Sequence, residues 1–176
     1  MKYPIAVIAA SAALVSFFCG EASELHSSAG CSATLTHPEC KVERTLALIK
    51  PDAVAANHIG EIIARLEQSG LRVIALKMVK WSEFDAQQFY NMHRDRPFFA
   101  HLVKYMSCGP IVAIVLEGKD AVAHYRAIMG ATDPAAAGRG TLRALYGSSI
   151  EANGVHGSDS IENAQKEISL LFTESL

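Results

Sequence analysis

Residues 45–52 read Thr45-Leu46-Ala47-Leu48-Ile49-Lys50-Pro51-Asp52. The apolar run predicts a buried strand, and Pro51 ends it because proline has no N–H to give to a sheet. A doubly wound parallel sheet that binds a nucleotide carries a glycine-rich phosphate loop directly after its first strand. Here the strand runs into Lys50-Pro51-Asp52, which contains no glycine. The stretch therefore weighs against that fold.

The segments after this strand alternate between helical and strand-like patterns. Apolar residues recur at helical spacing from 59 to 66, and Gly70 ends that helix. Residues 71–81 are apolar without strict alternation, which predicts a central strand covered on both faces. Ser82, with Asp85 three residues later, predicts a capped helix start. The remaining expected segments are a short helix ending at 106 after Arg96-Pro97-Phe98-Phe99, a strand at 111–116, a helix at 120–129, an irregular segment at 131–150, a short strand before 157 and a helix at 158–172.

The resulting order is β-α-β-α-β-α-β-α, and two folds fit it. One is the doubly wound parallel sheet. The other is an α+β fold, a four-stranded antiparallel sheet covered by helices on the ferredoxin-like βαββαβ plan, with an inserted helical unit between the second and third strands. The motifs Gly-x-x-x-x-Gly-Lys-Ser/Thr and Gly-x-Gly-x-x-Gly are both absent from the sequence. A nucleotide site would then need phosphate ligands other than a P-loop.

Composition sets the class of protein. The chain has 176 residues, enough for one domain with a single core. Half of its residues are apolar, which is typical of a globular protein. The net charge of −2 argues against a surface devoted to nucleic acid. Its four cysteines show no spacing suited to zinc.

The N-terminal residues differ in character from the rest. An uncharged apolar run from Ile5 to Phe18 is short for a membrane span and suits a signal peptide, so residues 1–22 are expected to form an apolar leader. Residues 23–43 are polar and Ser-rich without a period, which predicts a linker, and 44–176 form the folded domain. Two interpretations stay open: a real export signal, or an extension ahead of a cytosolic domain. On export, Cys31 and Cys40 could pair; membrane contact is expected only if the leader is retained.

A histidine stands between two glycines in Asn153-Gly154-Val155-His156-Gly157-Ser158-Asp159. Glycine removes bulk beside the imidazole, so a large anion could approach it. Ser158 and Asp159 are good helix N-cap residues. The motif indicates a phosphate-handling histidine, with an ordinary surface loop as the alternative.

Cationic and acidic residues elsewhere add to this hypothesis. Lys50 ends an apolar strand, where a charge is rare unless it points into a cleft. Arg126 and Arg143 have guanidinium groups that suit phosphate oxygens, although each, taken singly, is more typical of a solvated surface charge. Glu167 lies eleven residues beyond His156, from where its carboxylate could fix the tautomer of the imidazole. The alternative for Glu167 is a solvated position on the flank of its helix.

Together these segments resemble the nucleoside diphosphate kinase family from about Glu43 to Phe172. The matching motifs are Arg44-Thr45-Leu46-Ala47-Leu48-Ile49-Lys50-Pro51-Asp52, Arg96-Pro97-Phe98-Phe99, Met129-Gly130-Ala131-Thr132-Asp133-Pro134, Gly140-Thr141-Leu142-Arg143 and Asn153-x-x-His156-Gly157-Ser158-Asp159. The last is similar to the active-site signature of the family. The chain departs from the family at Ala144-Leu145-Tyr146, where many members have a small residue, Asp and Phe.

The resemblance implies a function and a site. His156 would receive the γ-phosphate of a nucleoside triphosphate and pass it to a nucleoside diphosphate in ping-pong fashion, with Mg²⁺ carried by the phosphates and not by protein ligands. It implies the ferredoxin-like fold and a homo-oligomer, a tetramer or hexamer. The implied catalytic residues are His156, Lys50, Glu167, Ser158 and Tyr90, and the implied nucleotide-binding residues are Lys50, Phe98, Leu102, Arg126, Thr132, Arg143, Ile150 and Asn153.

Two functional hypotheses follow. The first is an active nucleoside diphosphate kinase that balances nucleotide pools, expected in the cytoplasm because its substrates are there. The second is a non-catalytic nucleotide-binding or interaction module on the same fold, exported through the N-terminal apolar segment. Intact catalytic residues favour the first hypothesis.

Overall fold

The computed structural model describes residues 42–172. The expected leader, nearly all of the expected linker, and Cys31 and Cys40 lie outside these residues. The described elements are β1 (Val42–Ile49), α1 (Pro51–Ala55), α2 (Ile59–Gln68), β2 (Arg72–Lys80), α3 (Glu83–Phe89), η1 (Asn91–His93), α4 (Phe99–Ser107), β3 (Pro110–Lys119), α5 (Ala121–Met129), η2 (Pro134–Ala136), α6 (Leu142–Tyr146), β4 (Val155–Gly157) and α7 (Ile161–Leu171).

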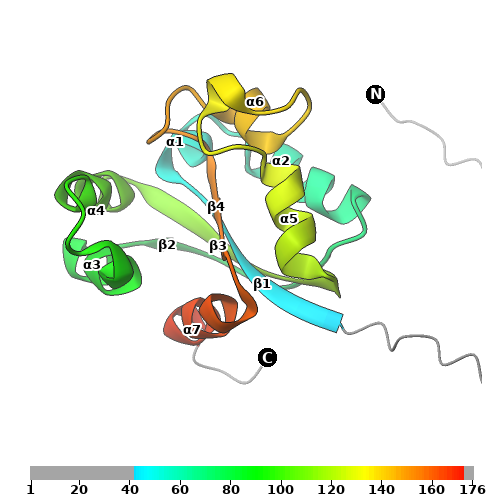
Figure 1. Ribbon diagram of the computed structural model, residues 1–176, viewed down its shortest axis with the longest axis horizontal. Coiled ribbons are helices and arrows are strands. Elements are labelled where there is room, and N and C mark those ends of the chain that lie inside the picture. The colour runs from blue at the N-terminus through cyan, green and yellow to red at the C-terminus, as the bar shows by residue number, and fades with distance from the viewer. Residues whose placement is uncertain (1–41, 173–176) are drawn as a thin grey trace, which may run out of the picture. The chain divides into compact units, whose positions relative to one another are not determined.

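The four strands form one antiparallel sheet in the order β2-β3-β1-β4 (Figure 1). This is the ferredoxin-like order, and α3, η1 and α4 form the expected insertion between β2 and β3. The predicted α+β fold is therefore confirmed, and the doubly wound alternative is wrong because no pair of strands in the described chain is parallel.

Helices cover both faces of the sheet (Figure 1). Successive side chains of a strand point to opposite faces. In β1, Ala47 and Ile49 pack with α1, α2, α5 and α6, whereas Leu46 and Leu48 pack with α3, α4 and α7. The unbroken apolar run of β1 thus follows from burial on both sides.

The prediction that residues 71–81 form a central strand is wrong. β2 lies at the edge of the sheet, where β3 is its only partner among the strands of residues 42–172. Its apolar residues Leu76 and Met78 are 47% and 55% exposed. Lack of alternation indicates an apolar strand, but it does not show what covers the strand.

Three boundaries also differ from expectation. Residues 131–150 contain η2 and α6, which the helical pattern missed because each is too short to show a period. Pro51 ends β1 and also begins α1, a position where its missing N–H costs nothing. The last helix begins at Ile161 with Ser160 as its N-cap, because the Ser160 hydroxyl accepts from the Asn163 amide, so Ser158 and Asp159 are not its caps. The Ser158 hydroxyl instead donates to the Glu167 carboxylate.

Within residues 42–172, no helix is long and apolar enough to cross a membrane.

Candidate active site

A cavity of about 460 Å³ opens where β1 ends, β4 begins and α4 approaches the loop before β4. Its volume lies in the range of small-molecule sites. Most of the residues predicted from the sequence line it. They are Lys50, Tyr90, Phe98, Leu102, Thr132, Arg143, Ile150, Asn153 and His156. We refer to this hollow as the first cavity.

His156 lies in the middle of β4, opposite Leu48 of β1. The pairing holds its backbone, and its carbonyl oxygen also accepts a hydrogen bond of 3.1 Å from the Tyr125 hydroxyl. The side chain is 23% exposed, so the ring reaches the first cavity without being a free surface group. The rings of Phe89 and Tyr90 meet the imidazole edge-on, with centroids 5.3 and 5.7 Å away. The surface-loop alternative is therefore wrong.

Glu167 and Ser158 lie behind the imidazole and hold it. Glu167 is only 7% exposed, which excludes a solvated position. Its Oε1 lies 3.3 Å from His156 Nε2, and its Oε2 accepts a 2.6 Å hydrogen bond from the Ser158 hydroxyl. The Leu46 amide donates to the same Ser158 oxygen, so the hydroxyl proton is directed to the carboxylate. With that carboxylate as acceptor, Nε2 carries the ring proton and Nδ1 keeps its lone pair.

Lys50 is a buried cation at the floor of the first cavity. The residue is 5% exposed. Its ammonium donates to Asn153 Oδ1 at 2.9 Å and to the Glu151 carbonyl oxygen, and lies 5.0 Å from the centre of the Tyr105 ring. Burial lowers the pKa of Lys50 from 10.5 to about 8, because a desolvated ammonium is disfavoured.

Arg143 is a second cation with donor capacity to spare. Its Nη1 donates to the Gly130 carbonyl oxygen at 2.9 Å and its Nη2 lies 3.4 Å from that of Val155. Its Nε is buried without a hydrogen-bond partner among residues 42–172, and desolvation lowers the pKa of the guanidinium. Among the described residues, neither Arg143 nor Lys50 forms a salt bridge. Two partly desolvated cations without carboxylate partners favour an anionic ligand.

Asn153 connects the walls of the first cavity. Its amide nitrogen donates to the carbonyl oxygens of Thr132 and Ile150, at 3.0 and 2.9 Å, and its amide oxygen receives Lys50. The residue is 3% exposed and has no freedom to turn away. It therefore keeps the irregular segment in register with the end of β1.

Three predicted residues do not line the first cavity: Glu167 and Ser158, which lie behind the imidazole, and Arg126. Arg126 is exposed on α5 and is not among the lining residues. Its charge acts on this region from outside, since it contributes to the lowered pKa of Arg143.

The departure at 144–146 has a structural role. Tyr146 packs against His58 with ring centroids 4.6 Å apart, and its hydroxyl accepts a 3.0 Å hydrogen bond from Arg65 Nε. These contacts join α6 to α2. Arg143 is itself held by backbone carbonyls, so its position does not need the missing aspartate.

The role expected for Gly157 was wrong. A Cβ at Gly157 would lie 2.5 Å from Tyr125 Cε1 and 2.7 Å from Met129 Cε. The residue is small because α5 packs against β4, and not because a phosphate needs the space. The other glycine of the motif, Gly154, has a φ of 77°, which glycine adopts without strain.

Two titratable residues of the first cavity were missed by sequence reasoning. His101 and Glu151 both line it, and His101 Nδ1 lies 2.6 Å from Glu151 Oε1. In the sequence, these two residues are marked only by their closeness to predicted ones: His101 is one helical turn after Phe98, and Glu151 follows Ile150.

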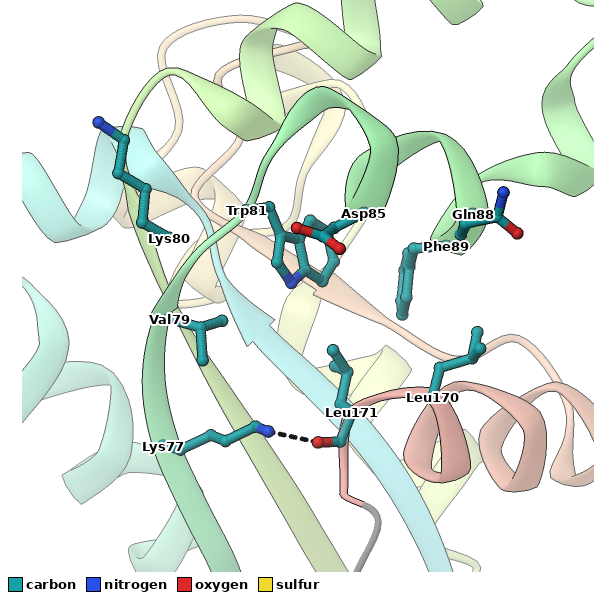
Figure 2. A pocket seen from close by; sticks show the side chains of 9 residues that line it. All are labelled: Lys77, Val79, Lys80, Trp81, Asp85, Gln88, Phe89, Leu170 and Leu171. Atoms are coloured by element: carbon teal, nitrogen blue, oxygen red, sulfur yellow. Dashed lines mark hydrogen bonds between the residues drawn. The ribbon is translucent and has the colours of Figure 1, made fainter.

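A second cavity of about 400 Å³ lies between β2, α3 and α7 and contains none of the predicted site residues (Figure 2). Lys77 crosses it to donate to the Leu171 carbonyl oxygen. Phe89 lines this cavity, packs 4.9 Å from Trp81 and also contacts the His156 ring. The aromatic wall of the second cavity therefore supports the histidine.

Lys50 and Arg143, without carboxylate partners among the described residues, line the same cavity as His156 and the exposed side chains of Phe98 and Ile150. Cationic groups suit phosphates, and exposed apolar side chains suit a base. Comparison with known proteins identifies the family. Residues 43–176 match the nucleoside diphosphate kinase family. A nucleoside diphosphate kinase of Nitratiruptor sp. is 59% identical over 133 residues, covering 76% of this chain and 97% of the relative. One of Halorhodospira halophila is 57% identical over 131 residues, covering 74% and 93%.

Solved structures agree. The nucleoside diphosphate kinase of Aquifex aeolicus has a TM-score of 0.74 at 45% identity, over 75% of this chain and 96% of that one. The enzyme of Halobacterium salinarum, in complex with CDP, has a TM-score of 0.73 at 40% identity, over 76% and 90%. The chain belongs to the nucleoside diphosphate kinase family. It is a nucleotide-binding phosphotransferase, and this supports the catalytic hypothesis over the non-catalytic module.

Proposed function

We propose that His156 carries the phosphate. Its Nδ1 lone pair attacks the γ-phosphorus of a nucleoside triphosphate, the bond to the β–γ bridging oxygen breaks, and the diphosphate leaves with that electron pair. A terminal β-phosphate oxygen of a second diphosphate then attacks the phosphorus, and the P–N electrons return to Nδ1. No proton moves, because the proton on Nε2 stays on the ring with Glu167 Oε1 as its acceptor. The observation that carries this proposal is the 3.3 Å contact between Nε2 and Glu167.

The proposed binding roles follow the two ends of the first cavity. Lys50 and Arg143 bind the phosphates through their positive charges. Burial raises the pKa of Tyr90, so its phenol stays protonated and can donate a hydrogen bond. Thr132 and Asn153 lie between the ends, suited to phosphate and ribose. Phe98, Leu102 and Ile150 form an apolar slot for the base, where Phe98 and Ile150 are 52% and 63% exposed. For Arg126 we propose only a contribution to the positive potential.

Magnesium is proposed to arrive as part of the substrate. Residues 42–172 contain no group of three or more His, Cys, Asp or Glu side chains able to hold a metal ion. The cavity offers cations, and Mg²⁺ requires oxygen ligands. Such a donor set fits a metal bound by nucleotide phosphates, where it neutralises charge on the transferring group.

The test of this function is phosphoenzyme formation. Incubation with ATP labelled on the γ-phosphate is expected to label the protein, and the label should survive base but not acid. Because Nε2 is held by Glu167, the phosphate should be found on Nδ1. Unlabelled nucleoside diphosphate should then remove the label as triphosphate. A chain that binds nucleotide but never acquires label would refute the proposal.

We propose that the chain assembles into a homo-oligomer, a tetramer or hexamer, through the edge of its sheet. β2 has an unpaired edge and exposes Leu76 and Met78, and such an edge is a template for pairing. Light scattering should give a mass of several chains, and Met78→Glu should lower it. Phe84→Glu is the matched control, since Phe84 is 67% exposed on α3 and is not part of β2. Wild-type protein with the mass of one chain would contradict this.

A cytoplasmic location is supported by the reaction itself, which consumes nucleoside triphosphates. Cell fractionation with N-terminal sequencing of the native protein distinguishes this from export.

A further inference from the structure

A contact between a histidine and a glutamate lies at the mouth of the first cavity. His101 on α4 and Glu151 in the loop before β4 meet at 2.6 Å between Nδ1 and Oε1. Both residues line the cavity. The His101 side chain is 76% exposed and that of Glu151 is 33% exposed, so the pair lies at the mouth. Exposed pairs of this kind contribute little to folding, and both side chains are within reach of a ligand in the cavity that they line.

The position of the pair relative to the apolar slot is fixed by its neighbours. His101 is one helical turn from Phe98, and Glu151 is next to Ile150. The backbone of Glu151 is also held, because its carbonyl oxygen accepts from the buried Lys50 ammonium. A base seated between Phe98 and Ile150 would therefore present an edge to the Glu151 carboxylate.

We propose that Glu151, oriented by His101, is a specificity-determining residue that selects guanine; this rests on the proposed nucleotide site. An ionised carboxylate only accepts hydrogen bonds. Guanine presents two adjacent donors, N1–H and the 2-amino group. Adenine presents one donor beside an acceptor, and uracil one donor between two carbonyl oxygens. Only guanine can give a carboxylate two parallel charge-assisted hydrogen bonds.

His101 acts as a positioning residue in this scheme. A glutamate side chain has several rotatable bonds, and one that is a third exposed samples many conformers. The contact with His101 occupies one lone pair of Oε1. Oε2 and the remaining lone pair of Oε1 stay available for the base. The contact with His101 thus orders the Glu151 carboxylate before the nucleotide arrives.

The experiment isolates one half-reaction. Phosphoenzyme is prepared from labelled ATP and then discharged with GDP, IDP or ADP, and the second-order rate constants are compared. IDP lacks only the 2-amino group of GDP. The wild type should prefer GDP over IDP by about fivefold to tenfold, since a site built for a hydrogen bond rejects the analogue lacking it. The preference should appear at low diphosphate concentration and vanish at saturation.

The informative variant is Glu151→Gln. Its amide has one acceptor and one donor, which match the edge of adenine. The ratio of the GDP rate constant to the IDP rate constant should fall to about one. The GDP-to-ADP ratio should fall by at least the same factor, because the same hydrogen bond is lost. The substitution also removes a charge that raises the pKa of Lys50, but that change affects all nucleotides alike and cancels in the ratios. His101→Ala should lower the ratios in the same direction by a smaller factor.

The chain offers a matched control. His58 and Glu61 form a second surface pair, with 3.5 Å between Nδ1 and Oε2, on α2 and outside the first cavity. Glu61→Gln should leave all ratios unchanged. Unchanged ratios in Glu151→Gln would overturn the proposal while labelling of the wild type still supports the kinase function. Failure of the wild type to label would overturn the function itself.

Discussion

His156→Ala is expected to abolish phosphate transfer, with kcat reduced by about ten-thousandfold or more, because the covalent intermediate cannot form without its nucleophile. The variant should still fold, since the ring is partly exposed and the main contact of β4 with β1 is through the backbone. The measurement is steady-state transfer from ATP to a diphosphate, together with labelling of the protein. Nucleotide binding should persist, because Lys50, Arg143 and the apolar slot are untouched.

A second histidine provides the control for this result. His124 lies on α5, is partly exposed and is outside the first cavity. His124→Ala should leave both labelling and turnover near the wild-type level. If His156→Ala still acquires acid-labile label, the phosphate goes to another residue and the assignment of His156 is wrong.

The fold could be predicted from the sequence where both faces of an element are buried. β1 is such a case, because Leu46 and Leu48 face one set of helices and Ala47 and Ile49 face the other. β2 is not buried on both faces. Its apolar run lacks alternation, as that of β1 does, but the strand lies at the edge of the sheet. Periodicity reports which residues avoid water, and it does not report whether the chain itself covers them.

The site divides in the same way. His156 and Lys50 are unusual in their local context, one between glycines and one at the end of an apolar strand, so the sequence singles them out. His101 and Glu151 are ordinary surface residues by sequence. Their contact depends on how α4 approaches the loop before β4, fifty residues later in the chain. Such pairs become apparent only in the three-dimensional structure.

Lys50→Met is expected to lower kcat/KM by about a hundredfold to a thousandfold, the cost of removing a pre-placed charge from developing phosphate charge. Methionine has a similar length and no charge, so the cavity keeps its shape. The loss should appear with every nucleotide, since Lys50 is proposed to meet the phosphates, which all nucleotides share, and it touches Asn153 and only the backbone of Glu151. A variant with wild-type kcat/KM would show that Lys50 is only structural.

The pH dependence of the wild type gives the same residue a second signature, and its sign differs between activity and stability. Burial lowers the pKa of Lys50 to about 8, against 10.5 for an ordinary lysine. Activity needs the ammonium, so kcat/KM should fall as pH rises through about 8. Stability should change the other way: between pH 8 and 10.5 the unfolded chain binds the proton and the folded chain does not, so this residue's contribution to the free energy of unfolding rises with pH.

Lys50→Met separates these two effects. With no titrating group at position 50, its residual activity should lack the fall near pH 8, and its denaturant midpoint should lack the corresponding rise relative to wild type. A fall near pH 8 that persists in Lys50→Met would assign that titration to another group. The opposite signs follow from a single cause: the fold keeps a cation in a place that disfavours it, and an anionic substrate is what makes that cation favourable.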